Sequence, residues 1–156
     1  MSGLVALITI DILVVAGVSI GVGAIAPRWP SRWLSRDRVP LALMGWETPA
    51  AYRRIGVSRL ARILPELGAA FGGQSKSALP GLSAADLELY LRELRRAEWV
   101  HWVSTASPLV LFLFNPWWLA LVFLVVVALG NLPFILVLRN NRRRTGAIIA
   151  RNENRT

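Results

Sequence analysis

Two long apolar runs constrain the fold of this chain more than any other feature. The first, Leu4 to Ala26, contains one charged residue, Asp11, and at about 1.5 Å per helical residue it is long enough to cross a hydrocarbon core of about 30 Å. The second extends from Trp99 to Leu138 and is interrupted by Asn115-Pro116, a pair that is typical of a turn. The sequence therefore predicts three transmembrane helices, at about residues 4–26, 99–114 and 117–138.

The composition also indicates a membrane protein. Of the 156 residues, 54% are hydrophobic, and the mean hydropathy of +0.49 is too high for an ordinary soluble domain. This length suffices for one compact unit, so we expect a single all-α integral membrane domain over residues 1–156. The chain has no cysteine, which excludes a disulfide framework, a zinc–cysteine site and a thiol nucleophile.

The arginines predict the orientation in the membrane. Of the 18 basic residues, 12 lie between Arg28 and Arg96 and six lie from Arg139 onward, whereas the turn at Asn115 has none. Because loops rich in Lys and Arg remain cytoplasmic, we expect a multi-pass cell-membrane protein with its N-terminus outside and its C-terminus in the cytoplasm. Anionic headgroups explain the net charge of +9 better than nucleic acid, which we set aside as a partner.

The cytoplasmic segment, residues 27–98, carries signals of amphipathic helices that lie in the membrane interface. Thr48-Pro49 is an N-cap followed by proline at the first helical position, and after Ser58 apolar residues recur at helical spacing opposite arginines. Ser83 and Asp86 resemble a capping box and open a helix that we expect to continue as far as Ser107-Pro108. A basic tail, residues 139–156, follows the last span.

The only histidine, His101, lies on that predicted helix three residues after Glu98. At about 100° per residue, Glu98, His101 and Thr105 fall within an arc of about 60°. Ionisable groups at membrane depth normally face protein or a wet cavity because lipid rejects them. Two interpretations follow equally from the residues: an ion pair that docks two helices, or a carboxylate that holds an imidazole as general base for acyl transfer to a hydroxyl.

Other polar residues and one small-residue motif complete the candidates. Pro133 frees a backbone carbonyl in the last span, and the simplest role of Asn131 is to satisfy that kink. Asp11 is at least as readily a structural residue as a functional one. Gly17-x-x-x-Gly21 is a packing motif that is compatible with a homo-oligomer. We expect one cluster near the cytoplasmic interface, formed by Glu93, Glu98, His101, Asn131 and Arg139.

Two stretches together resemble a known family. RELRRAEWVHWVS, residues 92–104, and GNLPFILVLRNNR, residues 130–142, resemble the small membrane acyltransferases named for glycosyl-4,4'-diaponeurosporenoate acyltransferase. The chain keeps, of the family pattern, Glu93, Arg96, Ala97, Glu98, His101, Trp102, Asn131, Pro133, Arg139, Asn141, Arg142 and Arg144. It departs from that pattern at Leu94, Leu138, Asn140 and Arg143. Weaker matches in the middle of the chain are Arg28-Trp29-Pro30, Glu47 before Tyr52, and Leu64-Pro65-Glu66 before Lys76.

The resemblance implies an O-acyltransferase that moves a fatty acyl group onto a hydroxyl of a glycosylated lipid, as in the staphyloxanthin carotenoid pathway. His101 would be the general base and Glu98 would orient it. The substrate-binding residues implied are Glu93, Arg96, Asn131, Arg139, Asn141 and Arg142. No cofactor or metal is expected, and acyl-CoA or another acyl donor would be the co-substrate beside the lipid acceptor. Without a cysteine or a G-x-S-x-G motif, direct transfer is favoured over an acyl-enzyme.

Two alternatives remain open at this point. Glu-x-x-His on a bundle helix is also an element of di-iron sites, but such a site needs the motif twice, so that only a symmetric dimer could supply it. In the other alternative the chain is a non-enzymatic membrane scaffold or subunit, in which Glu98 and His101 only dock helices.

Overall fold

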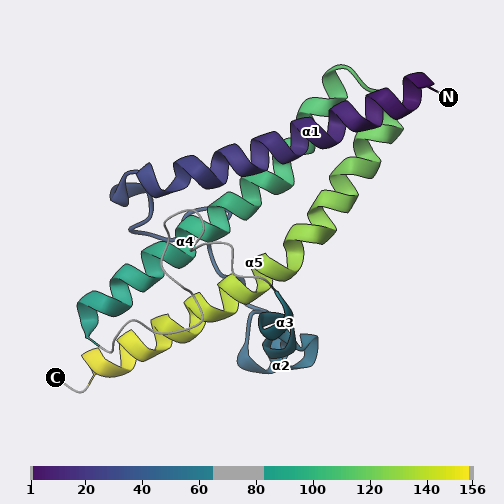
Figure 1. Ribbon diagram of the computed structural model, residues 1–156. Coiled ribbons are helices and arrows are strands. Elements are labelled where there is room, and N and C mark those ends of the chain that lie inside the picture. Colours follow the sequence, from purple (N-terminus) through teal and green to yellow (C-terminus); the bar gives the residue numbers. More distant parts are fainter. Residues whose placement is uncertain (1, 65–82, 155–156) are drawn as a thin grey trace.

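A computed structural model describes residues 2–64 and 83–154, whose regular secondary structure is helical, without any strand (Figure 1). The all-α prediction is therefore confirmed for the part of the chain described. The elements are α1 (Ser2–Ile25), η1 (Ala26–Arg28), η2 (Ser31–Trp33), α2 (Pro49–Ile55), α3 (Val57–Ile63), α4 (Ala84–Ala106), η4 (Ser107–Leu113) and α5 (Trp117–Glu153). Part of the predicted interfacial segment, residues 65–82, lies outside the described residues.

Three long helices form the body of the molecule. α4 lies between α1 and α5, and η4 with the following turn reverses the chain so that α4 and α5 run antiparallel (Figure 1). The short helices α2 and α3 pack beside α5. A small core of Tyr90, Leu94, Ala97 and Leu138 joins α4 to α5, and the spacing of its α4 members places them on one face of that helix.

Two helices, not three, are long and apolar enough to cross a membrane among the residues described. They are Gly3–Arg28 and Trp117–Glu153. The predicted span at 99–114 is wrong as a continuous transmembrane helix, because α4 begins in a charged stretch at Ala84 and ends at Ala106. Pro108 cannot donate a backbone hydrogen bond, and the chain tightens there into the 3-10 helix η4.

The second correction concerns the end of the last span. We predicted a helix over 117–138 and a separate basic tail over 139–156, but α5 continues without a break to Glu153 and contains Pro133. The side-chain amide of Asn131 donates to the carbonyl of Val127 at 2.9 Å, rather than to the carbonyl four residues before the proline. The basic residues from Arg139 to Arg151 are therefore held on a helix that is continuous with the apolar span.

The predicted helix starts at Thr48 and Ser83 are confirmed, whereas Ser58 does not cap a helix, because α3 begins at Val57 after Gly56. The hydroxyl of Thr48 accepts a hydrogen bond from the amide of Ala51 at 3.2 Å, and α2 begins at Pro49. The hydroxyl of Ser83 accepts from the amide of Asp86 at 3.1 Å, as expected of a capping box. Between α2 and α3 the chain turns at Gly56, whose φ of +77° is a conformation that other residues rarely adopt.

Asp11 has a structural partner. Its side chain is fully buried, and its Oδ1 accepts a hydrogen bond of 2.8 Å from Nδ2 of Asn115, which lies in the turn before α5. This contact ties α1 to the turn between η4 and α5. Gly17 and Gly21 lie on an exposed side of α1, and self-association through them stays a prediction.

Candidate active site

A buried carboxylate marks the contact between α4 and α5. Glu98 on α4 is fully buried, and its Oε1 accepts hydrogen bonds from Nη1 of Arg139 at 2.8 Å and from Nε1 of Trp102 at 3.3 Å. Its Oε2 accepts from Nη1 of Arg142. Burial raises the pKa of the Glu98 carboxyl, and the positive charges of Arg142 and Arg139 oppose this effect. Two guanidinium groups, one turn apart on α5, therefore share one carboxylate.

The guanidinium of Arg139 is saturated by groups of the protein. Its Nε and Nη2 bind the two oxygens of Glu47 at 2.7 and 2.6 Å, its Nη1 binds Glu98, and its remaining donors reach the carbonyls of Pro40 at 3.0 Å and Ala42 at 2.6 Å. Arginine has five N–H donors, and all of them have acceptors here. With 4% of its surface exposed, Arg139 has no donor left for a ligand.

A second arginine binds the same stretch of chain. Nη2 of Arg142 donates to the carbonyl of Leu41 at 2.6 Å and lies 2.8 Å from Oδ2 of Asp37. The other oxygen of Asp37 accepts from Nε of Arg95 at 2.6 Å, and Arg95 also reaches the carbonyl of Leu34 at 3.2 Å. Arginines from both α4 and α5 thus fasten one loop to the helix pair.

We call residues 34–47 the clamped segment. At its end, Glu47 accepts hydrogen bonds from Arg139, the hydroxyl of Tyr52 and the amide of Met44. Burial opposes the ionisation of Glu47, but these hydrogen bonds outweigh it and lower its pKa from 4.5 to about 2. Burial and the bond to Glu47 raise the pKa of Tyr52, so that its hydroxyl remains a neutral donor.

His101 lies one turn further along α4 and makes a different kind of contact. Its Nδ1 is 2.8 Å from Oδ1 of Asn131 on α5, and its ring stacks on Phe134 with centroids 4.8 Å apart and planes 16° apart. Because Nδ2 of Asn131 donates to the carbonyl of Val127, the amide oxygen faces the imidazole. The contact then requires a proton on Nδ1, which leaves the lone pair of the neutral ring on Nε2.

The structure brings most of the predicted site residues together. Glu98, His101, Asn131, Arg139 and Arg142 lie along the contact between α4 and α5. They form two adjacent groups, an ionic one around Glu98 and a second one in which His101 contacts Asn131.

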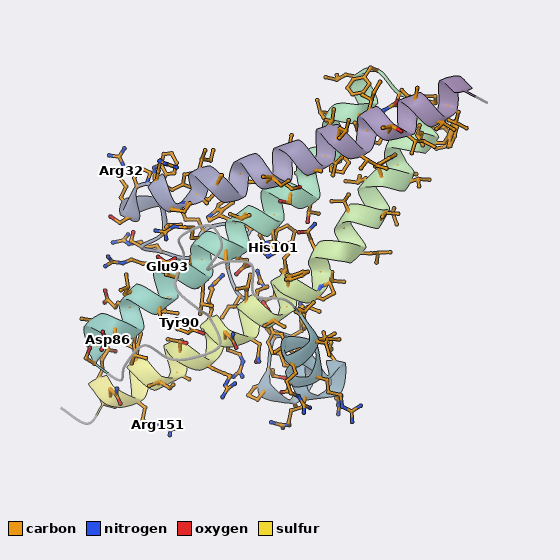
Figure 2. The ribbon with its side chains drawn as sticks, in the orientation of Figure 1. Arg32, Asp86, Tyr90, Glu93, His101 and Arg151 are labelled. Atoms are coloured by element: carbon orange, nitrogen blue, oxygen red, sulfur yellow. The ribbon has the colours of Figure 1, made fainter. Side chains whose placement is uncertain are left out.

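Three predicted residues lie apart from these two groups. Glu93 and Arg96 form an ion pair with each other within α4, and Glu93 and His101 are labelled on that helix in Figure 2. Asn141 accepts a hydrogen bond from the hydroxyl of Thr145 at 2.9 Å through its backbone carbonyl.

Asp37, Glu47 and Tyr52 were not among the predicted site residues. In the sequence, Glu47 and Tyr52 were only part of a weak family match. Helical periodicity cannot predict contacts between residues that are distant in the chain. One signal was available, since residues 28–62 contain eight arginines and only two acidic residues, Asp37 and Glu47.

Comparison with known proteins gives one family. A family model described as glycosyl-4,4'-diaponeurosporenoate acyltransferase matches residues 30–151. A curated protein of that name from Staphylococcus haemolyticus (strain JCSC1435) is 36% identical over 70 residues, which cover 45% of this chain and 40% of that protein. No solved structure matches. The family model covers most of the chain, both groups of site residues included, and this protein therefore belongs to the glycosyl-4,4'-diaponeurosporenoate acyltransferase family.

Proposed function

We propose that this protein is an integral-membrane O-acyltransferase that moves a fatty acyl group onto a hydroxyl of a glycosylated lipid, with His101 as general base. The observation that carries the proposal is the contact of 2.8 Å between Nδ1 of His101 and Oδ1 of Asn131. A general base needs an imidazole in a defined tautomer with its lone pair available for a proton. Asn131 supplies the group that selects this tautomer.

In the proposed reaction, Nε2 of His101 takes the proton of the acceptor hydroxyl as the oxygen attacks the acyl carbonyl of a thioester donor. The tetrahedral intermediate collapses, the carbon–sulfur bond breaks, and the imidazolium returns its proton to the leaving thiolate. An ester and a free thiol result, and the histidine is regenerated. The carbonyl dipole of Asn131 stabilises the imidazolium while it exists.

In this proposal the ionic group around Glu98 positions His101. Both oxygens of Glu98 are bonded to neighbouring side chains, and Arg139 has no N–H left for a donor phosphate. Glu98 is one turn from His101, so the ion pairs with Arg139 and Arg142 fix the register in which His101 meets Asn131. We therefore assign Arg139 and Arg142 to holding the site together and not to direct contact with the acyl donor.

A membrane location agrees with the surface of the two apolar helices. Large apolar side chains are exposed along both, among them Leu13 at 65% and Ile20 at 59% on α1, and Val126 at 62% and Leu129 at 62% on α5. Water would make such a surface costly, whereas lipid tails would cover it. The proposed orientation keeps the N-terminus outside and the end of α5 in the cytoplasm, as the arginines predict.

The scaffold alternative is favoured by one observation, the saturated ionic group. A buried arginine whose donors are all used by its own protein fastens structure together without needing a reaction. The dimeric metal site has less support, because a metal on Glu98 would have to displace two guanidinium groups. Among the described residues, no three side chains of His, Asp, Glu or Cys gather as ligands for a metal ion.

Acyl transfer by purified variants separates the enzyme from the scaffold. The protein in neutral-lipid nanodiscs would receive labelled acyl-CoA and a glycosyl-terpenoid acceptor, and ester formation would be followed. A general base supplies about 10²–10⁴-fold in rate, so we expect His101→Gln to lose at least about a hundredfold. The glutamine side chain retains an N–H donor for Asn131, so we expect the variant to fold. Arg151→Gln is the control for expression and purification. A well-folded His101→Gln protein with the parent's turnover would exclude His101 as the general base, and a parent protein that forms no ester would leave the scaffold as the function.

A further inference from the structure

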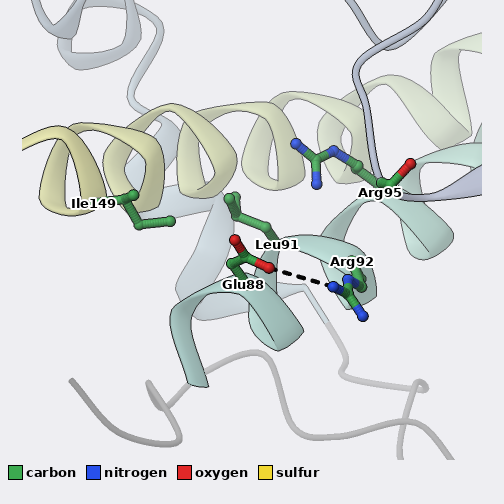
Figure 3. A pocket seen from close by; sticks show the side chains of 6 residues that line it. Glu88, Leu91, Arg92, Arg95 and Ile149 are labelled. Carbon is green, nitrogen blue, oxygen red and sulfur yellow. Dashed lines mark hydrogen bonds and ion pairs between the residues drawn. The ribbon is translucent and has the colours of Figure 1, made fainter. Parts of the chain in front are cut away.

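A small cleft lies on α4 beyond the clamped segment, on the side away from His101. It has a volume of about 240 Å³ and is lined by Ser35, Glu88, Leu91, Arg92, Arg95 and Ile149 (Figure 3). Four of these residues belong to α4, one comes from the clamped segment, and one comes from the last turns of α5. Neither group of the candidate active site contributes a side chain to this lining.

Arg95 presents a fixed guanidinium edge to the cleft. Its Nε is bonded to Asp37 at 2.6 Å and its Nη1 to the carbonyl of Leu34 at 3.2 Å, and its side chain is only 13% exposed. Among the described residues, no acceptor is bonded to its Nη2. A guanidinium that is held on one edge and available on the other is preorganised for an anion, because little rotamer entropy remains to be lost.

Arg92 supplies a second and more mobile cation. It lies one turn before Arg95, and its ion pair with Glu88 has a length of 3.3 Å with side-chain exposures of 40% and 64%. Exposed pairs of this kind contribute little to stability, so Arg92 is readily turned toward a ligand. Two arginines on one helix face are a common arrangement for phosphate, which accepts hydrogen bonds from both.

We propose that this cleft binds a phosphate group, carried either by a water-soluble acyl donor such as coenzyme A or by an anionic phospholipid. Arg92 and Arg95 hold the phosphate oxygens, and Glu88 opposes binding by its like charge. The link to catalysis rests on the proposed function. Arg92 and His101 are nine residues apart, about 14 Å along the helix and on opposite faces of it, so a carrier bound at the cleft needs an extended arm that passes around α4 to reach the histidine.

Variants that remove either a positive or a negative charge from the cleft test the proposal. Arg92→Gln removes a cation that pairs with Glu88 and with no other residue in the described part of the chain, and Glu88→Gln removes the opposing anion without touching Arg95. Arg95→Lys retains charge but loses the fork geometry. The matched control is Arg59→Gln on α3, which removes one exposed arginine remote from the cleft. Calorimetry in phosphate-free maltoside micelles would measure binding of coenzyme A and of inorganic pyrophosphate, and native mass spectrometry would measure retention of phosphatidylglycerol.

We expect Arg92→Gln to weaken binding of the phosphate probe roughly five- to tenfold and Glu88→Gln to strengthen it by a similar factor, with Arg59→Gln unchanged. This pattern with coenzyme A and pyrophosphate identifies a soluble carrier, and the same pattern only with phosphatidylglycerol identifies a lipid headgroup. Equal binding by the parent, Arg92→Gln and Glu88→Gln, or an equal loss in Arg59→Gln, overturns the proposal. If the probes bind as expected but the protein transfers no acyl group, the proposed function is wrong and the assignment of the cleft as a phosphate site is retained.

Discussion

Replacement of Arg139 tests whether the ionic group holds the site together or binds the acyl donor. Arg139→Ala removes the bidentate pair with Glu47, one of the two ion pairs of Glu98, and the bonds to the carbonyls of Pro40 and Ala42. Removing one partner of a buried ion pair costs about 3–5 kcal/mol, because a buried charge is left uncompensated. Here Glu98 keeps Arg142 and Glu47 keeps Tyr52, so we expect the lower half of that range.

The comparison with Arg139→Lys gives the sharper result. Lysine retains the charge but has three donors and no planar fork, so it cannot serve all the acceptors that arginine serves. We expect Arg139→Ala to lower the melting temperature by roughly 10 °C and Arg139→Lys to fall between it and the parent. Arg144→Ala, an exposed arginine on the same helix, is the matched control and should melt like the parent.

Melting of the purified variants in one detergent would be followed by the loss of the monodisperse peak after heating, and acyl transfer would be measured across a donor titration. A positioning role predicts that Arg139→Lys lowers turnover per folded molecule and leaves the KM for the donor unchanged. The reasoning fails if Arg139→Lys melts like the parent and raises the donor KM, since this would place Arg139 in contact with the donor.

The remaining predictions concern Glu47 and Asp11. The pKa of Glu47 is depressed from 4.5 to about 2, so its contribution of about 3 kcal/mol is complete above pH 4.5 and is lost as the pH falls toward 2. Glu47→Gln should therefore melt lower at pH 7 and lose less stability than the parent between pH 5 and 3; parallel melting curves would contradict this. A double-mutant cycle of Asp11→Ala and Asn115→Ala should give a coupling of about 1 kcal/mol in thermal stability, and additive losses would exclude the hydrogen bond as a stabilising contact.

Local signals in the sequence predicted the helix starts well. Thr48 and Ser83 each precede a helix and cap it as expected, because capping depends on residues within one turn. The end of α4 near Pro108 also follows from a local cause. What the local signals could not give is the conformation after that point, since a run of apolar residues fits a 3-10 helix as well as an α-helix.

The contacts of the clamped segment could not be predicted from the sequence. Its contacts with Arg139 and Arg142 join residues that are 92 to 101 positions apart, and several of the acceptors are backbone carbonyls that carry no residue-specific signal. An arginine at the end of an apolar span is expected for topology alone, so its sequence position does not distinguish a solvated flank from a buried clamp. Only the packing of the clamped segment against α4 and α5 distinguishes a buried clamp from a solvated flank.

Glu-x-x-His at the start of an apolar stretch is explained by a division of roles along one helix face. The residue nearer the charged end of α4, Glu98, pairs with Arg139 and Arg142, whose positive charges oppose the effect of burial on its carboxyl. One turn further on, where the surroundings become apolar, the partner on α5 is a neutral amide and the titratable group is the imidazole of His101. A permanent ion at the position of His101 would be more costly to desolvate than an imidazole, whose neutral form carries no charge. The spacing thus puts the ion pairs at the charged end of α4, and under the proposed function it puts the general base one turn closer to the apolar end of that helix.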